Sequence, residues 1–381
     1  MTELMNDNRK KKTILLTGAT GFLGETVARR LKQQGHRLIC LVRGANGAER
    51  LRSKIPLLES DDAVLVCDLS RERAEWDPAL VDCRGSIDAV AHCASMVRFH
   101  EYLAQDIHRT NVEGTRQLLG LATELQVPEF HYVSTAYVAG DAETFEESDR
   151  EKGQKTRNPY EASKLEAEKQ VAAWREGRYS IYRPSVIVGD QETGLSQSDT
   201  GFYGIHAVFE RLKRLLLRIL SVDGVEYREA GIFFDSKQVL NLPLSVRTSA
   251  SSTLNLIPVD WVGNMMGELL GQPASNAVYH LVHPDPPMAR WVFQTSVELF
   301  GIRGMHFDGR SAGPSEILDR MQRLMDRNIG IYDPYINRTE ARFGDAAVRA
   351  ALGDRYTPPP EVDRKFLAHL LKHAVYQEGT A

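Results

Sequence analysis

The chain has 381 residues, of which 42% are hydrophobic and 26% charged, with a formal net charge of −4. This length can bury a large core, and the nearly balanced charge argues against a nucleic-acid partner. Cys40, Cys67, Cys83 and Cys93 form no C-x-x-C pair, so we expect free thiols and no metal site. No run of about 18 apolar residues occurs, so we expect no transmembrane segment and a cytoplasmic protein.

The stretch 13–24, TILLTGATGFLG, predicts a strand, a tight turn and a helix. Gly18 suits the turn, Gly21 permits close approach of a pyrophosphate, and Gly24 lets the helix lie close to the strand. An ordinary glycine turn is the alternative that the glycines alone leave open. Because a second buried strand follows at 38–42, the stretch predicts the βαβ unit of a dinucleotide site.

Strands and helices alternate along the first half of the chain. A polar, basic-leaning connection is expected over 44–60. Further strands are expected at 63–67, 87–92, 130–135 and 179–182, with helices over 101–126 and 160–174. This order predicts an α/β fold with a doubly wound, parallel, Rossmann-like sheet.

The alternation stops near residue 190, where glycine-rich loops begin. We therefore expect a disordered tail over 1–12 and a dinucleotide-binding domain over 13–189, completed by about 253–283. Residues 190–252 and 284–381 are expected to form a smaller C-terminal substrate-binding domain.

Tyr160 and Lys164, in YEASK, are four residues apart on an expected helix, so both side chains project from one face. An ammonium group there would favour the phenolate and lower the pKa of the tyrosine. Such spacing is common by chance, but this pair follows the expected fifth strand. Ser134 and Thr135 end that strand, where ligands gather in such sheets.

Several motifs now occur in order: TGATGFLG, STAYVAG, NPYEASK, RPSVIVGD and NLIPVDWV. Over roughly residues 12–265 they resemble the extended short-chain dehydrogenase/reductases. Within that family the chain is most similar to the branch containing male-sterility-type fatty acyl-CoA reductases and thioester reductase domains. The C-terminal third carries little recognisable signal.

The resemblance implies that Tyr160 is the general acid or base, that Lys164 lowers its pKa and holds the nicotinamide ribose, and that Thr135 hydrogen-bonds the substrate carbonyl. Thr135 is preferred to Ser134 because it lies five residues before Gly140. It also implies a nicotinamide dinucleotide cofactor, with Asp68 and Leu69 beside the adenine, Ala94 along the cofactor and Pro184 to Val186 near the nicotinamide. The full expected cofactor set comprises Gly18, Thr20, Gly21, Phe22, Leu23, Arg43, Asp68, Leu69, Ala94, Tyr160, Lys164, Pro184 and Val186.

Arg43 ends the second strand, where an acidic residue would hydrogen-bond the 2′-hydroxyl of NAD. A guanidinium can instead bond a 2′-phosphate bidentately, and Arg50, Arg52 or Lys54 could add a second contact. The alternative is a solvated charge at the strand end. We therefore predict a preference for NADPH over NADH.

Three further polar residues have structural alternatives. For His92 and Cys93 a packed, hydrogen-bonded role is favoured over metal binding or nucleophilic chemistry, because no third ligand has suitable spacing. Asn111 is either a helix surface residue or a brace that holds the Tyr160 helix through its amide.

The stretch 205–220, IHAVFERLKRLLLRIL, predicts an amphipathic helix. The expected apolar side holds Ile205, Val208, Phe209, Leu212, Leu215, Leu216 and Ile219, and the other side mostly holds Arg211, Lys213, Arg214 and Arg218. It is interpreted as a lid helix with a solvated basic face. The alternative is a docking face for an acidic carrier protein, for coenzyme A phosphates or for a membrane surface.

We therefore predict an NADPH-dependent reductase of an acyl thioester, on coenzyme A or a carrier protein, in fatty-acid or polyketide metabolism. Its product would be an aldehyde and, after a second reduction, an alcohol. One alternative is a ketone or aldehyde reductase or a 3β-hydroxysteroid-like dehydrogenase of the same family. A non-catalytic nucleotide-binding protein is a further alternative, against which the retention of Thr135, Tyr160 and Lys164 argues. The sequence leaves monomer and homodimer open.

Overall fold

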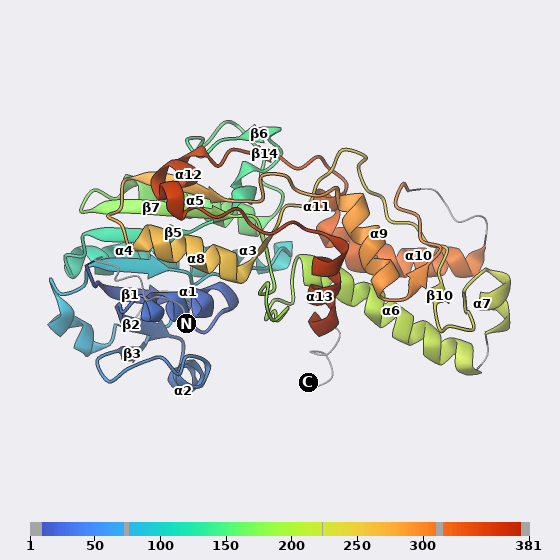
Figure 1. Cartoon of the computed structure of the whole chain (residues 1–381), viewed down its shortest axis with the longest axis horizontal. Helices are drawn as coiled ribbons and strands as arrows, with labels where there is room; N and C mark the ends of the chain where they lie inside the picture. Colours follow the sequence, from blue (N-terminus) through green and yellow to red (C-terminus); the bar gives the residue numbers. More distant parts are fainter. Residues whose placement is uncertain (1–9, 72–75, 223, 310–314, 375–381) are drawn as a thin grey trace.

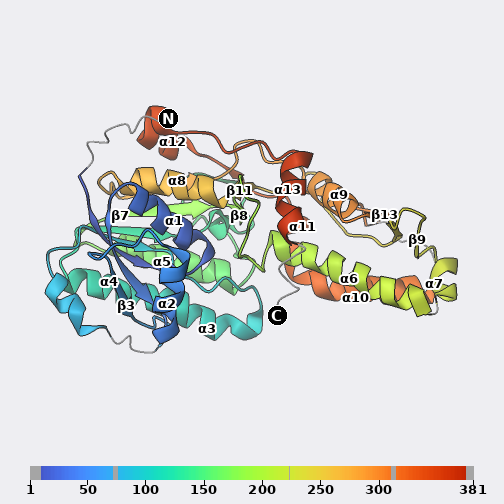
Figure 2. The ribbon, with the colours of Figure 1, turned by 60° about the horizontal axis from the view of Figure 1, so that its bottom comes forward.

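The computed structural model describes residues 10–71, 76–222, 224–309 and 315–374. In Figure 1 a layered body built on a sheet lies on one side, and a smaller lobe containing α6, α9 and α10 lies on the other. Figure 2, turned by 60°, shows helices on both faces of the sheet.

The main sheet has seven strands, and all of its strand pairs are parallel. Their spatial order is β12 (Ala277–Leu281), β7 (Arg178–Pro184), β5 (Glu129–Val133), β4 (Ala89–His92), β1 (Thr13–Thr17), β2 (Arg37–Val42) and β3 (Ala63–Val66). The order reverses between β1 and β4, and ligands bind beyond the carboxyl ends of strands at such a point. The predicted doubly wound, Rossmann-like fold is confirmed.

Alternate residues of β1 point into two different cores, as the two-residue period of a strand requires. Ile14 and Leu16 pack with α1 (Phe22–Gln33) and α8 (Val259–Leu270). Leu15 packs on the other face with α4 (Gly114–Glu124) and α5 (Pro159–Ala173). Because β1 is buried on both faces, it reads in the sequence as a continuous apolar run.

Two local predictions in this body need correction. The expected connection over 44–60 contains α2 (Ala45–Lys54), because Leu51 and the following Ile55 are fully buried against the sheet. The expected helix over 101–126 contains α3 (Ala104–His108), a π-helical turn at Arg109–Glu113, and α4. The π turn includes Asn111, and such turns are frequent at functional sites.

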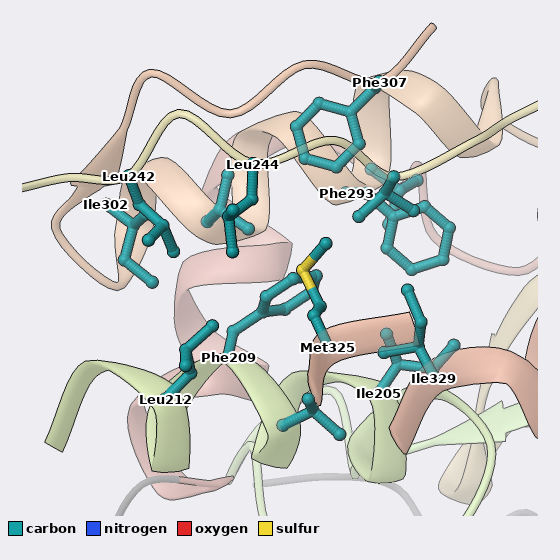
Figure 3. Close-up of a cluster of buried hydrophobic side chains, with 14 of the residues drawn as sticks. Ile205, Phe209, Leu212, Leu242, Leu244, Phe293, Ile302, Phe307, Met325 and Ile329 are labelled. Carbon is teal, nitrogen blue, oxygen red and sulfur yellow. The ribbon is translucent and has the colours of Figure 1, made fainter. Parts of the chain in front are cut away.

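The lobe has its own hydrophobic core, part of which Figure 3 shows. Its helices are α6 (Phe202–Val222), α7 (Val225–Glu229), α9 (Ala289–Leu299), α10 (Glu316–Ile329), α11 (Asp333–Ile336) and α13 (Arg364–Ala374). Short strands β9 (Phe233–Phe234), β10 (Leu240–Asn241) and β13 (Ile302–Arg303) join them in a small sheet. Phe209 of α6 and Met325 of α10 project into this core from facing helices.

The predicted amphipathic helix exists as α6, but its apolar stripe is narrower than predicted. Phe209 and Leu216 are fully buried, whereas Leu215 is 41% exposed, so its placement on the buried side was wrong. The helix packs against α9 and α10 along one stripe only. Leu215 lies beyond that stripe and is therefore exposed to solvent.

The predicted domain boundaries also need correction at both chain ends. Lys12 was placed in a disordered tail, yet its Nζ donates to Glu129 Oε2 at 2.8 Å and to the Leu270 carbonyl at 2.9 Å. Residues 1–9 of that tail lie outside the described residues. Within 284–381, α12 (Ala346–Leu352) packs on α8 and β12 of the sheet body, because Val348 and Leu352 join the core beside β1.

Two short strand pairs connect the elements around the carboxyl edge of the sheet. β8 (Val186–Val188) pairs with β11 (Leu256–Pro258), and β6 (Thr144–Phe145) pairs with β14 (Arg342–Phe343). Among the described residues, no helix is long and apolar enough to cross a membrane.

Candidate active site

The glycine turn has the geometry that a pyrophosphate site needs. Gly18 has a φ of +77°, and a Cβ there would lie 2.5 Å from the Ala94 nitrogen. A Cβ on Gly24 would overlap the Gly18 carbonyl, so both positions require glycine. α1 begins after Gly21 without a side-chain cap, which leaves its first amides for a ligand. The turn therefore fits the phosphates of a dinucleotide.

His92 supports this turn from the end of β4. Its Nδ1 lies 2.7 Å from Thr17 Oγ1, and its Nε2 lies 3.0 Å from Thr115 Oγ1. Thr17 Oγ1 also accepts from the Ala94 amide at 3.3 Å, next to the turn. Burial and the charge of Lys164 lower the pKa of His92 to about 3, so the ring is neutral. The predicted packed, hydrogen-bonded role of His92 is confirmed.

The residues expected at the adenine end lie at the carboxyl ends of β2 and β3. Arg43 is exposed and Leu69 is buried. Burial raises the pKa of Asp68, but hydrogen bonds from Ser70 and the charge of Arg43 outweigh it, so this pKa lies below its ordinary value. Lys54 points to the glycine turn and not to the adenine end, because its Nζ donates to the Thr20 carbonyl at 3.2 Å.

α5 carries Tyr160 and Lys164. The helix begins after Asn158, whose Oδ1 accepts from the Glu161 amide at 3.0 Å, and Pro159 occupies its first position. Lys164 is 2% exposed, and its Nζ donates to the Val133 carbonyl at 2.7 Å. Burial lowers the pKa of Lys164 to about 7. The helix therefore places the ammonium directly behind the end of β5.

The pKa of Tyr160 departs from the sequence expectation. Burial and the neighbouring Glu161 carboxylate raise this pKa, whereas Lys164 was expected to lower it. The physical reason is that burial disfavours the charged phenolate more than any nearby charge favours it. A raised pKa keeps the phenol protonated, which suits a proton donor.

Ser134 and Thr135 follow β5 and are both buried. Thr135 Oγ1 accepts from the Tyr137 amide at 3.3 Å and donates to the Pro184 carbonyl at 3.4 Å. Ser134 Oγ has no hydrogen-bond partner among the described residues. A buried hydroxyl without a partner is costly, so this oxygen is available for a ligand.

Asn111 braces the Tyr160 helix, as one of the two sequence interpretations predicted. Its Nδ2 donates to Ser163 Oγ at 2.9 Å and to the Met96 carbonyl at 3.2 Å. Its Oδ1 accepts from the Met96 amide at 2.8 Å. The amide thus ties the π turn to both α5 and the loop after β4.

One cavity of about 480 Å³ brings most of the predicted residues together. The predicted site residues that line this cavity are Gly18, Gly21, Phe22, Leu23, Thr135, Tyr160, Lys164, Pro184 and Val186. Thr20, Arg43, Asp68, Leu69 and Ala94 do not line it, and Arg43, Asp68 and Leu69 lie at the neighbouring strand ends. Cys93 does line it, and burial raises the pKa of this thiol to about 12, so it is no nucleophile at neutral pH.

Sequence reasoning missed the aromatic wall of this cavity. Phe99 packs on Tyr160 with ring centroids 6.0 Å apart, and also on Tyr332 and Tyr335 at 6.1 and 5.6 Å. Tyr332 and Tyr335 come from the lobe, more than 170 residues after Tyr160 in the chain. No local pattern could have joined residues so far apart.

The loop before α6 closes over the same cavity. Arg98 donates to both carboxylate oxygens of Asp199, at 3.2 and 3.1 Å, and both residues line the cavity. Gln197 donates to Glu25 Oε2 at 2.8 Å, which links the loop to α1.

A sequence model of the NAD-binding family described as male sterility protein matches residues 16–266. The chain belongs to this family. The match covers the glycine turn, the Tyr160 helix and most of α8, and it confirms the resemblance that the motifs predicted.

Solved structures support the fold over nearly the whole chain. The terminal R domain from the myxalamid PKS-NRPS biosynthetic pathway has a TM-score of 0.70 at 23% identity, covering 97% of this chain and 92% of that one. A thiolation-reductase di-domain from an archaeal non-ribosomal peptide synthetase has a TM-score of 0.69 at 18% identity, covering 96% and 75%. At these identities the likeness shows the fold alone.

Curated relatives match only part of their own length. A linear gramicidin synthase protein of Brevibacillus parabrevis is 28% identical over 301 residues, which is 73% of this chain and 5% of that protein. Fatty acyl-CoA reductase 1 of Xenopus laevis is 35% identical over 159 residues, which is 36% of this chain and 30% of that protein. The chain thus spans less than a third of either relative.

Proposed function

We propose that this chain is an NADPH-dependent reductase of an acyl thioester. The observation that carries the proposal is the cavity in which the glycine turn, Thr135, Tyr160 and Lys164 meet apolar side chains from the sheet body and the lobe. Relatives named as a fatty acyl-CoA reductase and as a polyketide synthase-nonribosomal peptide synthetase support a thioester as the carbonyl substrate.

In this proposal the substrate carbonyl lies between the end of β5 and Tyr160. The phenol of Tyr160 donates a proton to the carbonyl oxygen, and its raised pKa keeps that proton in place beforehand. The Thr135 hydroxyl, once its hydrogen turns from the Pro184 carbonyl, or the unpartnered Ser134 hydroxyl beside it, donates a hydrogen bond to the same oxygen. NADPH would supply the hydride when bound, and Lys164 would hold its nicotinamide ribose.

In this proposal the thiol leaves without formation of a covalent acyl-enzyme intermediate. Reduction of the thioester gives a hemithioacetal, which loses the thiol when its hydroxyl proton is removed, and the aldehyde remains. Cys93 lines the cavity, but the high pKa of its thiol keeps it protonated and unreactive.

One part of the cavity lining suits an apolar acyl group. Phe99, Ile205, Leu254, Tyr332 and Ile336 line it, and they come from both the sheet body and the lobe. Burying an acyl chain against such side chains is favourable in proportion to the apolar area removed from water.

A second, more polar cavity of about 590 Å³ offers the approach for the thiol arm of the substrate. It lies between α6 and α10 and shares Ser198, Asp199 and Tyr332 with the first cavity. Arg211 and Arg327 line it from the two helices. We propose that a phosphopantetheine arm, on coenzyme A or a carrier protein, passes here with its phosphate near these guanidinium groups.

The basic residues of α6 differ in their relation to this second cavity. Arg211 lines the cavity, whereas Lys213, Arg214 and Arg218 do not. Arg214 forms an ion pair with Glu210, and Lys213 donates to the Phe300 carbonyl. The proposed arm contact on α6 therefore involves Arg211, whereas the sequence suggested the whole basic face.

The preference for NADPH rests on Arg43. Its guanidinium is exposed at the end of β2, next to the region where a ribose would lie in this fold. Lys54 is held by Thr20 and Glu25 near the glycine turn, so Arg50 and Arg52 are the candidates for an additional contact with the 2′-phosphate.

Product identification tests the proposed function. The protein is incubated with NADPH and, in separate reactions, with an acyl-CoA, an acyl carrier protein and a matched methyl ketone, and products are identified by mass spectrometry. We expect aldehyde or alcohol and free thiol from the thioesters, formed at least about 10²-fold more slowly with Tyr160→Phe. Reduction of the ketone alone would contradict the proposal and favour the ketone reductase.

A further inference from the structure

Tyr335 of α11 connects the lobe to the first turn of the Tyr160 helix. Its Oη donates to Glu161 Oε1 at 2.7 Å and accepts from Asn158 Nδ2 at 2.5 Å. Asn158 and Glu161 flank Pro159 and Tyr160 in the sequence. One hydroxyl from the lobe therefore bonds to both side chains that bracket Tyr160.

These partners also form the cap of the helix. Asn158 Oδ1 accepts from the Glu161 amide at 3.0 Å, and Glu161 Oε2 accepts from the Arg157 amide at 2.8 Å. Such a reciprocal cap satisfies backbone donors that the helix itself cannot. Tyr335 closes it from outside, so the position of the first turn depends on a residue of the other lobe.

The hydrogen bond from Tyr335 to Glu161 matters because the Glu161 side chain is fully buried. Burial raises the pKa of Glu161, while the charge and amide of Arg157 and the hydroxyl of Tyr335 favour its ionised form. A buried carboxylate that loses a donor is poorly compensated. Removing the Tyr335 hydroxyl would therefore disturb the residue next to Tyr160.

The ring of Tyr335 faces the substrate space at the same time. It lies 5.6 Å from the Phe99 ring and 5.4 Å from the Tyr137 ring, and the Arg157 guanidinium lies 5.3 Å from its centroid. Phe99 in turn packs on Tyr160, and Tyr335 and Tyr160 line the same cavity. Tyr335 is thus held both by its ring contacts and by the hydrogen bonds of its hydroxyl.

We infer that Tyr335 is a positioning residue for the reaction, which sets the place of the Tyr160 phenol by holding the helix cap. The inference rests on the proposed function, in which Tyr160 is the proton donor. Reaction rates depend steeply on such placement, and misplacement by about 1 Å can cost two orders of magnitude. Cofactor binding, which also depends on the glycine turn and on Lys164 one turn further along the helix, is expected to change little.

The test compares Tyr335→Phe with Tyr227→Phe. Tyr227 is also in the lobe and also loses a hydroxyl contact, with Arg320 at 2.6 Å, but it lies outside both cavities. We expect Tyr335→Phe to lower kcat about tenfold or more, with the KM for thioester and the Kd for NADPH changed less than about twofold. Tyr227→Phe should keep the wild-type kcat.

Asn158→Ser gives a second route to the same result. Serine is a good helix cap, but its short side chain does not replace the amide donor to the Tyr335 hydroxyl, so the helix start is kept and the link to the lobe is weakened. We expect the same selective loss of kcat. In a double-mutant cycle, Tyr335→Phe combined with Glu161→Gln should lower kcat no further than the more severe single change, because both act through one contact.

A wild-type kcat in both Tyr335→Phe and Asn158→Ser, or independent losses that multiply in the double variant, would overturn the inference. These outcomes are distinct from failure of the proposed function, which would appear as wild-type protein that reduces ketones and not thioesters. In that case the comparison of kcat is made with the reduced ketone. Full activity of Tyr160→Phe would remove the premise and overturn the inference as well.

Discussion

Arg183 and Glu168 form a buried ion pair between β7 and the helix that carries Tyr160. Arg183 Nε donates to Glu168 Oε1 at 2.9 Å, and its Nη2 donates to Oε2 at 2.6 Å. The two side chains are 0% and 1% exposed. Glu168 lies one turn after Lys164, and Arg183 precedes Pro184 of the cavity wall. This pair therefore fixes the distance between two walls of the site.

Glu168→Gln should destabilise the protein by about 3–5 kcal/mol, because it leaves the Arg183 charge buried without its counter-charge. The double variant Glu168→Leu with Arg183→Met should recover much of this loss, since apolar side chains of similar volume need no partner. Urea unfolding measures both. A Glu168→Gln variant as stable as the wild type would show that the Asp149 carbonyl, which Arg183 Nη2 also contacts at 2.9 Å, is compensation enough.

Tyr160→Phe should lower kcat by at least about 10²-fold and leave NADPH binding nearly intact, because it removes a proton donor and little volume. Lys164→Ala should lower both kcat and NADPH affinity, since the ammonium is expected to hold the ribose. Steady-state kinetics and fluorescence titration of NADPH separate the two effects. Near-normal turnover in Tyr160→Phe would show that another group supplies the proton.

The sequence predicted the parts of the site that are local in the chain. The glycine turn, the strand ends and the spacing of Tyr160 and Lys164 follow from short patterns, because a βαβ unit folds from about thirty neighbouring residues. The order of these units then brings their strand ends to one edge of the sheet. The fold and the family were predictable for this reason.

The lobe side of the site was not predictable. Tyr335 and Tyr332 reach the cavity through packing between segments far apart in the chain, and neither lies in a recognisable motif. The predicted pKa of Tyr160 was wrong for the same kind of reason, because the burial that raises this pKa depends on tertiary packing. A helical wheel likewise could not show that Leu215 lies beyond the contact stripe of α6.

Thr135→Val and Ser134→Ala together decide which hydroxyl bonds the substrate carbonyl. The family pattern predicts Thr135, so Thr135→Val should lower kcat by about 10²-fold, comparable to loss of one donor in an oxyanion site. Ser134→Ala removes a hydroxyl that has no partner among the described residues, so it should cost little stability. A larger loss of kcat in Ser134→Ala than in Thr135→Val would assign the role to Ser134.

Arg211→Glu should raise the KM for a substrate on a phosphopantetheine arm, with little change in kcat, because Arg211 lines the second cavity. Arg218→Glu is the matched control, since it makes the same charge change about two turns along α6 and outside that cavity. Acyl-phosphopantetheine and acyl-pantetheine, which lacks the phosphate, are compared at low and high salt. Equal effects of both variants would indicate a diffuse attraction along the helix and no defined phosphate contact.

Arg43→Ala should erase most of a preference for NADPH over NADH. The wild type should bind NADPH at least about tenfold more tightly, because a hydrogen bond to a charged group contributes more than one to a neutral group. The exposure of Arg43 limits this contribution, since water and salt screen the charge. Asp68 carries a negative charge close to Arg43 and would repel a phosphate that Arg43 did not hold, so the variant should favour NADH in relative terms.

Titration of both cofactors against wild type, Arg43→Ala and the surface variant Arg37→Ala measures this preference. Arg37 lies at the opposite end of β2 and serves as the control. Equal affinities for NADPH and NADH in the wild type would mean that Arg43 is a solvated charge and that cofactor choice lies elsewhere.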